Sequence, residues 1–266
     1  MSEHSTAALL DSTTTSSQIA FLAELVRGAS SVVALSGAGI SVPSGIPDFR
    51  TPETGVWEKV DPMEVAHIDA FRGDPLRFWS FYGPRFATLA DKLPNDAHRV
   101  LVAMEQHGLL DAVITQNIDM LHRKAGTREL LEVHGSIASC TCLTCGESVS
   151  LGRVSTRLGL ATDGVPRCEE CAQPLKPDVV LFGELLPARA LERARELCEG
   201  ADVLLCIGSS LEVHPVAGLP LLTHAAGGKL AILTQGPTPL DALASVRLSG
   251  DVVVELAALC AALEID

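Results

Sequence analysis

A short apolar run that stops at glycines is the feature that most constrains the fold of this chain. Val32 to Leu35 is apolar and β-branched, as in the buried strands of parallel sheets, and Gly37-Ala38-Gly39 follows it. Glycines at this point let the backbone turn sharply and let a pyrophosphate approach nearby amides. The complete dinucleotide-binding fingerprint is absent, because Val42 stands where its third glycine would fall. The run predicts a strand that leads into a nucleotide site, with a simple tight turn as the alternative.

Three further apolar runs also end in small or polar residues. They are Leu110 to Thr115 before Gln116-Asn117-Ile118-Asp119, Ala201 to Ile207 before Gly208-Ser209-Ser210, and Lys229 to Leu233 before Thr234-Gln235. Helical patterns separate these runs, so we predict an α/β fold built on a Rossmann-like, doubly wound parallel sheet. Ligands of such folds bind at the carboxyl ends of the strands, which makes these polar loops the candidate site.

The length and charge of the chain exclude several classes of protein. A chain of 266 residues suits one large domain, or one domain carrying a small insertion, and a formal net charge of -13 argues against a nucleic-acid surface. The sequence has no signal-peptide pattern and no apolar run long enough for a membrane span, so we expect a cytoplasmic protein without membrane partners. Residues 1–17 are rich in Ser and Thr and are expected to form a flexible lead before a helix from Gln18 to Arg27.

Two Cys-x-x-Cys pairs, Cys142/Cys145 and Cys168/Cys171, predict a metal site. Four thiolates close a tetrahedral shell around zinc and leave no open position, so we expect one structural Zn²⁺ ion in a module inserted over residues 136–177. A redox-active dithiol is the alternative, but such motifs are seldom duplicated. Cys140 could compete with Cys142 as a ligand, although only the outer pair repeats the two-residue gap.

Together these motifs resemble those of the sirtuins, which are NAD-dependent protein lysine deacylases. The resemblance is carried by Gly37 to Ser41, Ser44 to Arg50, Thr115 to Asp119, His134-Gly135, both cysteine pairs, Phe182-Gly183-Glu184 and Gly208 to Leu211. It implies an NAD-binding domain over residues 18–135 and 178–266, a zinc-ribbon module between them, and an acyl-lysine peptide in the intervening cleft. The implied reaction moves the acyl group to the ADP-ribose of NAD and releases nicotinamide and O-acyl-ADP-ribose. We expect the enzyme to act as a monomer.

The resemblance also assigns roles to residues. It implies that His134 is the general base for a ribose hydroxyl, and that Asn117 and Asp119 position the ribose and a water molecule. The implied NAD-binding set is Gly37, Ala38, Gly39, Ile40, Asp48, Phe49, Arg50, Gln116, Asn117, Ile118, Asp119, His134, Gly208, Ser209, Ser210, Thr234, Gln235 and Val252. The implied substrate-binding set is Tyr82, Arg85, Val180, Phe182, Gly183, Leu211 and Val213.

Two positions bear on specificity. Tyr82-x-x-Arg85 matches a pair that faces the distal end of the acyl chain in one sirtuin subclass, and a guanidinium beside a phenol can hold a carboxylate. Succinyl- and malonyl-lysine are therefore expected substrates beside acetyl-lysine, unless the pair is an aromatic core position next to a solvated arginine. Thr234 replaces the Asn usual in the family, so binding of the adenine ribose is expected to be weaker or rearranged.

Three other functions fit parts of the sequence. A mono-ADP-ribosyltransferase would share the release of nicotinamide but would leave the adenosine label on a protein. A zinc-ribbon binding module with a vestigial nucleotide fold would have no need of the His134 set. A dehydrogenase would follow from Gly-x-Gly alone and would form NADH.

Overall fold

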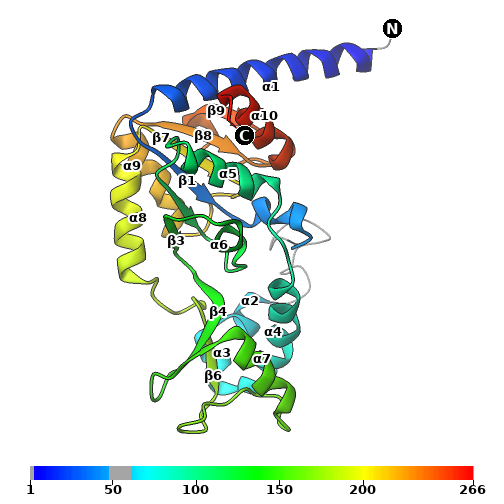
Figure 1. Cartoon of the computed structure of the whole chain (residues 1–266), viewed down its shortest axis with the longest axis vertical. Coiled ribbons are helices and arrows are strands. Elements are labelled where there is room, and N and C mark those ends of the chain that lie inside the picture. The colour runs from blue at the N-terminus through cyan, green and yellow to red at the C-terminus, as the bar shows by residue number, and fades with distance from the viewer. Residues whose placement is uncertain (1–2, 48–60, 266) are drawn as a thin grey trace.

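Six parallel strands form the central sheet of this computed structural model, which describes residues 3–47 and 61–265 (Figure 1). The strand order is β3-β2-β1-β7-β8-β9. The strands are β1 Val32–Ser36, β2 Ala112–Thr115, β3 Leu130–Glu132, β7 Val203–Ile207, β8 Lys229–Leu233 and β9 Ala244–Leu248. Strands β1, β2, β7 and β8 confirm the four apolar runs. The predicted set missed β3, which is short and half-buried, and β9, in which polar residues alternate with apolar ones.

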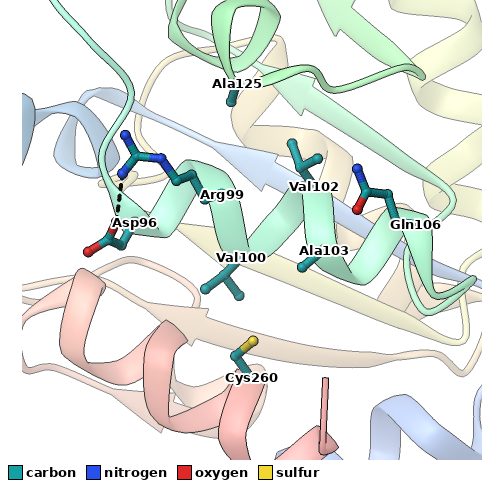
Figure 2. A pocket seen from close by; sticks show the side chains of 8 residues that line it. All are labelled: Asp96, Arg99, Val100, Val102, Ala103, Gln106, Ala125 and Cys260. Carbon is teal, nitrogen blue, oxygen red and sulfur yellow. Dashed lines mark hydrogen bonds and ion pairs between the residues drawn. The ribbon is translucent and has the colours of Figure 1, made fainter. Parts of the chain in front are cut away.

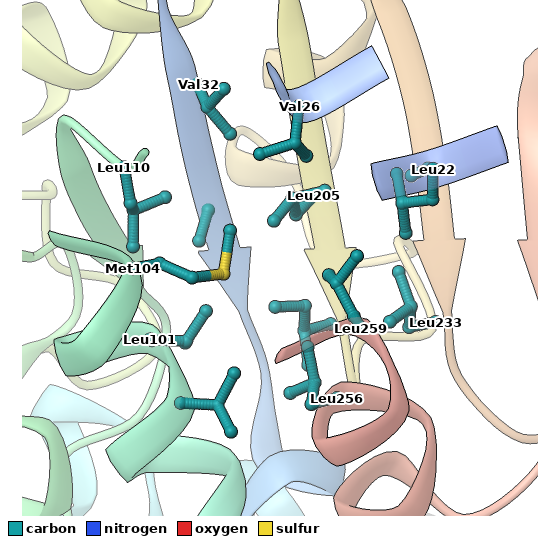
Figure 3. Close-up of a cluster of buried hydrophobic side chains, with 14 of the residues drawn as sticks. Leu22, Val26, Val32, Leu101, Met104, Leu110, Leu205, Leu233, Leu256 and Leu259 are labelled. Carbon is teal, nitrogen blue, oxygen red and sulfur yellow. The ribbon is translucent and has the colours of Figure 1, made fainter. Parts of the chain in front are cut away.

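Helices cover both faces of this sheet, as the doubly wound prediction requires. One face carries α1 Glu3–Gly28, α5 Asp96–Gln106 and α10 Val252–Leu263, and the other carries α8 Ala188–Gly200 and α9 Leu219–Ala225. Side chains of β1 alternate between the two layers, with Val32 and Ala34 in the first core and Val33 and Leu35 in the second. Figure 3 shows the first core, to which α1 contributes Leu22, α5 contributes Leu101 and α10 contributes Leu256. Burial on both faces explains why these strands read as continuous apolar runs.

The first helix is longer than the sequence pattern indicated. It begins at Glu3 instead of near Gln18, so the polar lead continues the helix and the expected boundary is wrong. The reason is that no proline or glycine interrupts residues 3–27. Figure 1 shows the amino-terminal part of α1 extending beyond the sheet.

A smaller unit lies at the other end of the molecule (Figure 1). It contains a three-stranded antiparallel sheet of β5 Ser148–Ser150, β4 Gly135–Cys142 and β6 Leu175–Val179, together with α7 Leu151–Leu160. Helices α2 Pro62–Val65, α3 Ile68–Gly73 and α4 Pro75–Ala90 belong to the same region. One hydrophobic core unites Phe71, Phe78 and Trp79 of these helices with Ile137 and Leu175 of the sheet. The boundaries 136–177 inferred from sequence leave these aromatic helices out.

Four short helices complete the large unit. These elements lie in the loops that follow strands of the large sheet: η1 Ala38–Ser44 after β1, α6 Leu121–Ala125 after β2, η3 Val216–Gly218 after β7 and η4 Asp241–Leu243 after β8. Within residues 3–47 and 61–265, no helix combines the length and apolar character needed to cross a bilayer.

Candidate active site

Two glycine-containing loops pack against each other where β1 and β7 end. The amide of Gly37 donates to the carbonyl oxygen of Ile207 at 2.9 Å, and that of Gly39 donates to Gly208 at 2.8 Å. A Cβ on Gly208 would lie 2.3 Å from the amide nitrogen of Ile40, so only glycine permits this approach. The glycines therefore serve loop-to-loop packing, and the amides of Gly37 and Gly39 are already used within the protein. A phosphate at this edge would need other donors.

A hydroxyl joins the loop after β1 to the loop after β2. Ser41, on η1, donates to Asp119 Oδ2 at 2.6 Å, and its oxygen lies 3.2 Å from the donor Asn117 Nδ2. Asn117 Nδ2 also donates to the carbonyl oxygen of Gly37 at 3.0 Å. Ser41, Asn117 and Asp119 are all buried. The structure thus brings the two predicted residues together through Ser41, a residue to which the sequence motifs assign no role.

Asp119 lies in a setting that favours its protonated form. Burial raises the pKa of this carboxyl above its ordinary value, and the bonds from Ser41 and from the amide of Leu121 oppose that shift. The Leu121 amide donates to Asp119 Oδ1 at 2.8 Å, so both carboxyl oxygens are engaged. The side chain is therefore held in one orientation at the start of α6.

His134 follows β3 and has one ring nitrogen fixed. Its Nδ1 lies 3.0 Å from the carbonyl oxygen of Gln116, which can only accept a hydrogen bond. Nδ1 therefore carries the proton, and Nε2 holds the lone pair. Burial lowers the pKa of His134, while the Gln116 bond acts in the opposite direction. A neutral imidazole with a defined acceptor nitrogen is suited to general-base chemistry.

The remaining predicted residues of the β2 and β7 loops are also placed at this edge. Gln116 Nε2 donates to Ser209 Oγ at 2.9 Å, and this oxygen also accepts from the amide of Leu211 at 3.2 Å. Ala38 and Ser210 are half-buried at the surface of the same loops. Ile40 is fully buried, so it supports the loop from below. Asp48, Phe49 and Arg50 lie outside the described residues.

An arginine that the sequence patterns did not single out organises the loop after β8. Arg247 donates through Nη1 to the carbonyl oxygen of Thr234 at 2.8 Å and through Nε to Asp241 at 2.9 Å. It also bonds the carbonyl oxygen of Gly236. The exposed Gln235 lies on this loop, and the buried Val252 begins α10. An arginine on a neighbouring strand gives no local sequence signal for such a contact.

The candidate substrate rim is the segment Val180 to Gly183. The Val180 amide donates to the carbonyl oxygen of His134 at 2.8 Å, and the Phe182 amide donates to Ala66 at 2.8 Å. Phe182 itself is 47% exposed. Backbone hydrogen bonds therefore attach the rim to His134 on one side and to Ala66, next to α3, on the other. Leu211 and Val213 follow β7, and Leu211 is buried with a φ of 55°.

Tyr82 and Arg85 lie on α4 but differ in environment. Tyr82 is buried among Phe78 and Phe86, and burial raises the pKa of its phenol while Arg85 opposes the shift. Arg85 is exposed, lies over the Phe81 ring at 3.6 Å and donates to the Phe81 carbonyl oxygen at 2.6 Å. The guanidinium is therefore close to the phenol but is turned along its own helix.

The four predicted metal ligands converge in the smaller unit. The sulfurs of Cys142 and Cys171 are 3.4 Å apart, as are those of Cys145 and Cys168, and all four lie within 4.8 Å of one another. A tetrahedral zinc–thiolate site with bonds of about 2.3 Å requires sulfur separations of about 3.8 Å. The cluster therefore fits one structural zinc ion. Cys140 is buried in the neighbouring core and does not belong to the cluster.

A shallow pocket of about 300 Å³ lies elsewhere, between α5 and α10 (Figure 2). Val100 and Cys260 face each other across it, and the Asp96–Arg99 ion pair lies at one end. None of the predicted site residues lines it. The chemistry-bearing residues gather instead at the carboxyl edge of the sheet.

Comparisons with known proteins agree with this arrangement. Residues 37–215 match the model of the Sir2 family. An NAD-dependent protein deacetylase of Sulfurisphaera tokodaii is 44% identical over 84% of this chain and 87% of its own length. An NAD-dependent protein deacylase 2 of Archaeoglobus fulgidus is 42% identical over 86% of this chain and 89% of its own. The solved structure of Sir2 with a p53 peptide and NAD⁺ superposes with a TM-score of 0.83 at 38% identity, covering 91% of this chain and 96% of that one.

Proposed function

Because the chain belongs to the Sir2 family, we propose that it is an NAD-dependent protein lysine deacylase whose reaction takes place at the carboxyl edge of the sheet. One observation carries this assignment: the Gln116 carbonyl oxygen holds His134 through Nδ1 and leaves Nε2 as the acceptor, while Ser41 links Asn117 to Asp119 on the loop that begins with Gln116. The related enzymes named above act on acylated protein with NAD.

The residues present fit NAD at this edge. Bound NAD supplies a ribose carbon that can be attacked as nicotinamide leaves. Gln116, Asn117 and Asp119 would offer amide and carboxyl groups to ribose hydroxyls, and Gly208 to Ser210 would contact the phosphates. His134 takes a proton from a ribose hydroxyl at Nε2, while the Gln116 carbonyl keeps the ring oriented. Ser41 keeps the Asp119 carboxyl and the Asn117 amide in place.

The acyl-lysine peptide is expected along the rim Val180 to Gly183, opposite Leu211 and Val213. This is supported by the exposed Phe182 and by the bond from the Val180 amide to His134, which ties the rim to the base. A peptide that pairs with such a segment gains backbone hydrogen bonds independent of its sequence. Solved Sir2 structures hold an acetylated peptide and a propionylated peptide.

Zinc has a structural role in this proposal. Cys142, Cys145, Cys168 and Cys171 would hold it between the two turns, and four thiolates leave no position for an activated water. The site needs reduced cysteines, which supports the expected cytoplasmic location.

The experiment that tests the proposal uses one lysine peptide in acetyl and succinyl forms. Each is incubated with NAD and the enzyme, and products are identified by mass spectrometry. We expect NAD-dependent loss of the acyl group together with O-acyl-ADP-ribose. The His134→Ala variant should abolish both products, whereas His107→Ala, at an exposed histidine that ends α5, should not. Release of nicotinamide with both peptides intact would overturn the deacylase assignment.

The acyl preference is a finer proposal: Arg85 swings from Phe81 toward the acyl chain and holds a distal carboxylate beside Tyr82. It is supported by the exposure of Arg85 and by its electrostatic influence on the phenol. Arg85→Met should then lower kcat/KM for the succinyl peptide by about tenfold more than for the acetyl peptide. Equal losses for the two peptides would show that Arg85 does not read the acyl group.

A further inference from the structure

Two buried histidines, His98 on α5 and His122 on α6, lie in contact behind the candidate active site. Their side chains are almost free of solvent exposure, at 0% and 2%, and their ring centroids are 4.8 Å apart. Neither belongs to the set that contacts NAD or peptide. Burial lowers the pKa of His98 to about 4 and that of His122 to about 3, so both are neutral at physiological pH.

His98 is connected to the turn that carries Ser41. Its Nδ1 lies 3.1 Å from Asn95 Oδ1, and this oxygen also accepts from the Ala97 amide, so His98 Nδ1 must be the donor. The amide group of Asn95 in turn donates to the carbonyl oxygen of Ile40 at 2.8 Å and to Ser44 Oγ at 3.0 Å. Ile40 and Ser44 belong to η1. His98 therefore braces η1 through one side chain.

His122 is connected to the strand end that carries Asn117. Its Nε2 lies 2.8 Å from Ser36 Oγ, which donates to Thr115 Oγ1 at 2.8 Å. Thr115 Oγ1 also accepts from the amide of Asn117 at 3.1 Å. Because the Ser36 hydroxyl uses its proton on Thr115, it accepts a hydrogen bond from the Nε2–H group of His122. This chain of bonds fixes the ends of β1 and β2 against each other, directly below Asn117.

The second nitrogen of each ring makes no such hydrogen bond. His98 Nε2 and His122 Nδ1 are buried and have no hydrogen-bond partner among the described residues. A buried acceptor without a donor lowers stability, and two apolar side chains of similar size would avoid that loss. The histidine pair therefore contributes less to the free energy of unfolding than two apolar side chains of similar size would. What the pair provides instead is the hydrogen bonds of His98 Nδ1 and His122 Nε2, which lead to η1 and to the ends of β1 and β2.

We propose that His98 and His122 are positioning residues that align η1 with the end of β2, so that Ser41 meets Asn117 and Asp119. Ser41 lies on η1, which His98 supports, and its partners Asp119 and Asn117, at 2.6 and 3.2 Å, follow β2, whose end His122 supports. The two rings are in contact, so they connect the two supported segments. Small misplacement of such groups reduces turnover strongly. The catalytic part of this inference rests on the proposed function, whereas the effect on NAD binding does not.

The test compares His98→Leu, His122→Leu and His122→Gln with His107→Leu as the matched control, since His107 is exposed and directly follows the helix that carries His98. For each variant, thermal unfolding gives Tm, calorimetric titration gives Kd for NAD, and kinetics give KM for NAD and for an acetylated peptide. We expect both Leu variants to keep or raise Tm at pH 7.5 and to weaken NAD binding about tenfold, with the peptide KM changing less than about twofold. His122→Gln restores an N–H donor and should recover much of the affinity.

Two results would overturn the proposal. Unchanged Kd and KM for NAD in both Leu variants would mean that the rings only fill space. A loss of NAD affinity that follows a fall in Tm, with no recovery in His122→Gln, would mean a general loss of structure. If the wild type binds NAD but removes no acyl group, the proposed function fails, while the NAD titrations still decide the role of the histidines.

Discussion

At the level of single residues, the site depends on hydrogen bonds that leave each group only one orientation. The Gln116 carbonyl oxygen fixes the tautomer of His134, and the Ser41 hydroxyl serves Asp119 as donor and Asn117 as acceptor. Sequence order separates Ser41 from its partners, so spacing alone could not assign it a role. The contact exists because η1 and the end of β2 meet at the same sheet edge.

The tautomer and burial of His134 predict how activity depends on pH. Because burial lowers its pKa below the ordinary value of about 6.5, the base stays neutral to lower pH than a free histidine. The kcat/KM for the acetylated peptide should therefore be constant near pH 7 and should fall only below about pH 6.5, as Nε2 becomes protonated. A pH profile of kcat/KM measures this. An acid limb centred above pH 7 would contradict the assignment of the base.

Removing the Ser41 hydroxyl should affect turnover more than folding. Ser41→Ala leaves Asp119 Oδ2 without its donor and Asn117 Nδ2 without one of its acceptors, so we expect kcat to fall by roughly 10- to 100-fold. The cost in unfolding free energy should be about 1–3 kcal/mol, measured by denaturant titration. Ser80→Ala, at an exposed position of α4, is the control and should change neither value. Wild-type kcat in Ser41→Ala would remove the serine from the mechanism.

At the level of elements, the sequence predicted strands best where both faces are covered. β1 and β7 are buried along their whole length and could be read directly from apolar runs. β9 is covered less completely, and its Arg247 makes contacts that only the neighbouring loop explains. The glycines at 37 and 39 predicted a loop at the right place, but the structure uses them to pack against Gly208. Local patterns thus located the site edge without revealing which loops share it.

The smaller unit shows the same limit. Its cysteine spacing identified the metal ligands, yet the aromatic helix α4 that packs on them carries no metal signal. Trp79, for example, donates to the carbonyl oxygen of Leu175 at 3.0 Å from far away in the chain. Contacts of this kind arise from tertiary packing and leave no periodic pattern in the sequence.

The cysteine cluster predicts a clear difference between two adjacent cysteines of β4. Cys142→Ala removes one of four sulfurs, so zinc should be lost and Tm should fall, because an incomplete thiolate shell no longer holds the two turns together. Cys140→Ala should keep one zinc per chain, since Cys140 lies outside the cluster. Zinc content by a chromogenic chelator, measured with Tm, separates the two. Full zinc in Cys142→Ala, or its loss in Cys140→Ala, would mean that the wrong sulfur had been identified.

At the level of the whole molecule, burial of ionisable groups couples the active site to stability. Asp119 and Glu255 have pKa values raised by burial, so they favour the folded state as pH falls. His98 and His122 act in the opposite direction. Their folded pKa values of about 4 and about 3 lie below the unfolded value of about 6.5.

The histidine pair should therefore make the fold sensitive to mild acid. Above pH 6.5 both rings are neutral in the folded and unfolded chain, and their contribution is fully present. Between pH 6.5 and about 4 the unfolded chain binds more protons, so stability is lost as pH falls. At pH 5 we expect a loss of about 2 kcal/mol from each ring and about 4 kcal/mol from the pair, which corresponds to a decrease in Tm of roughly 8 °C.

The double variant His98→Leu/His122→Leu isolates this effect. Zinc release and protonation of carboxylates change Tm in the wild type and the variant alike, so the difference between their Tm values reports the two histidines. That difference should grow in favour of the variant when pH falls from 7.5 to 5, because the variant has no buried ring to protonate. A constant difference between wild type and double variant would mean that the buried rings reach solvent and protonate without loss of stability.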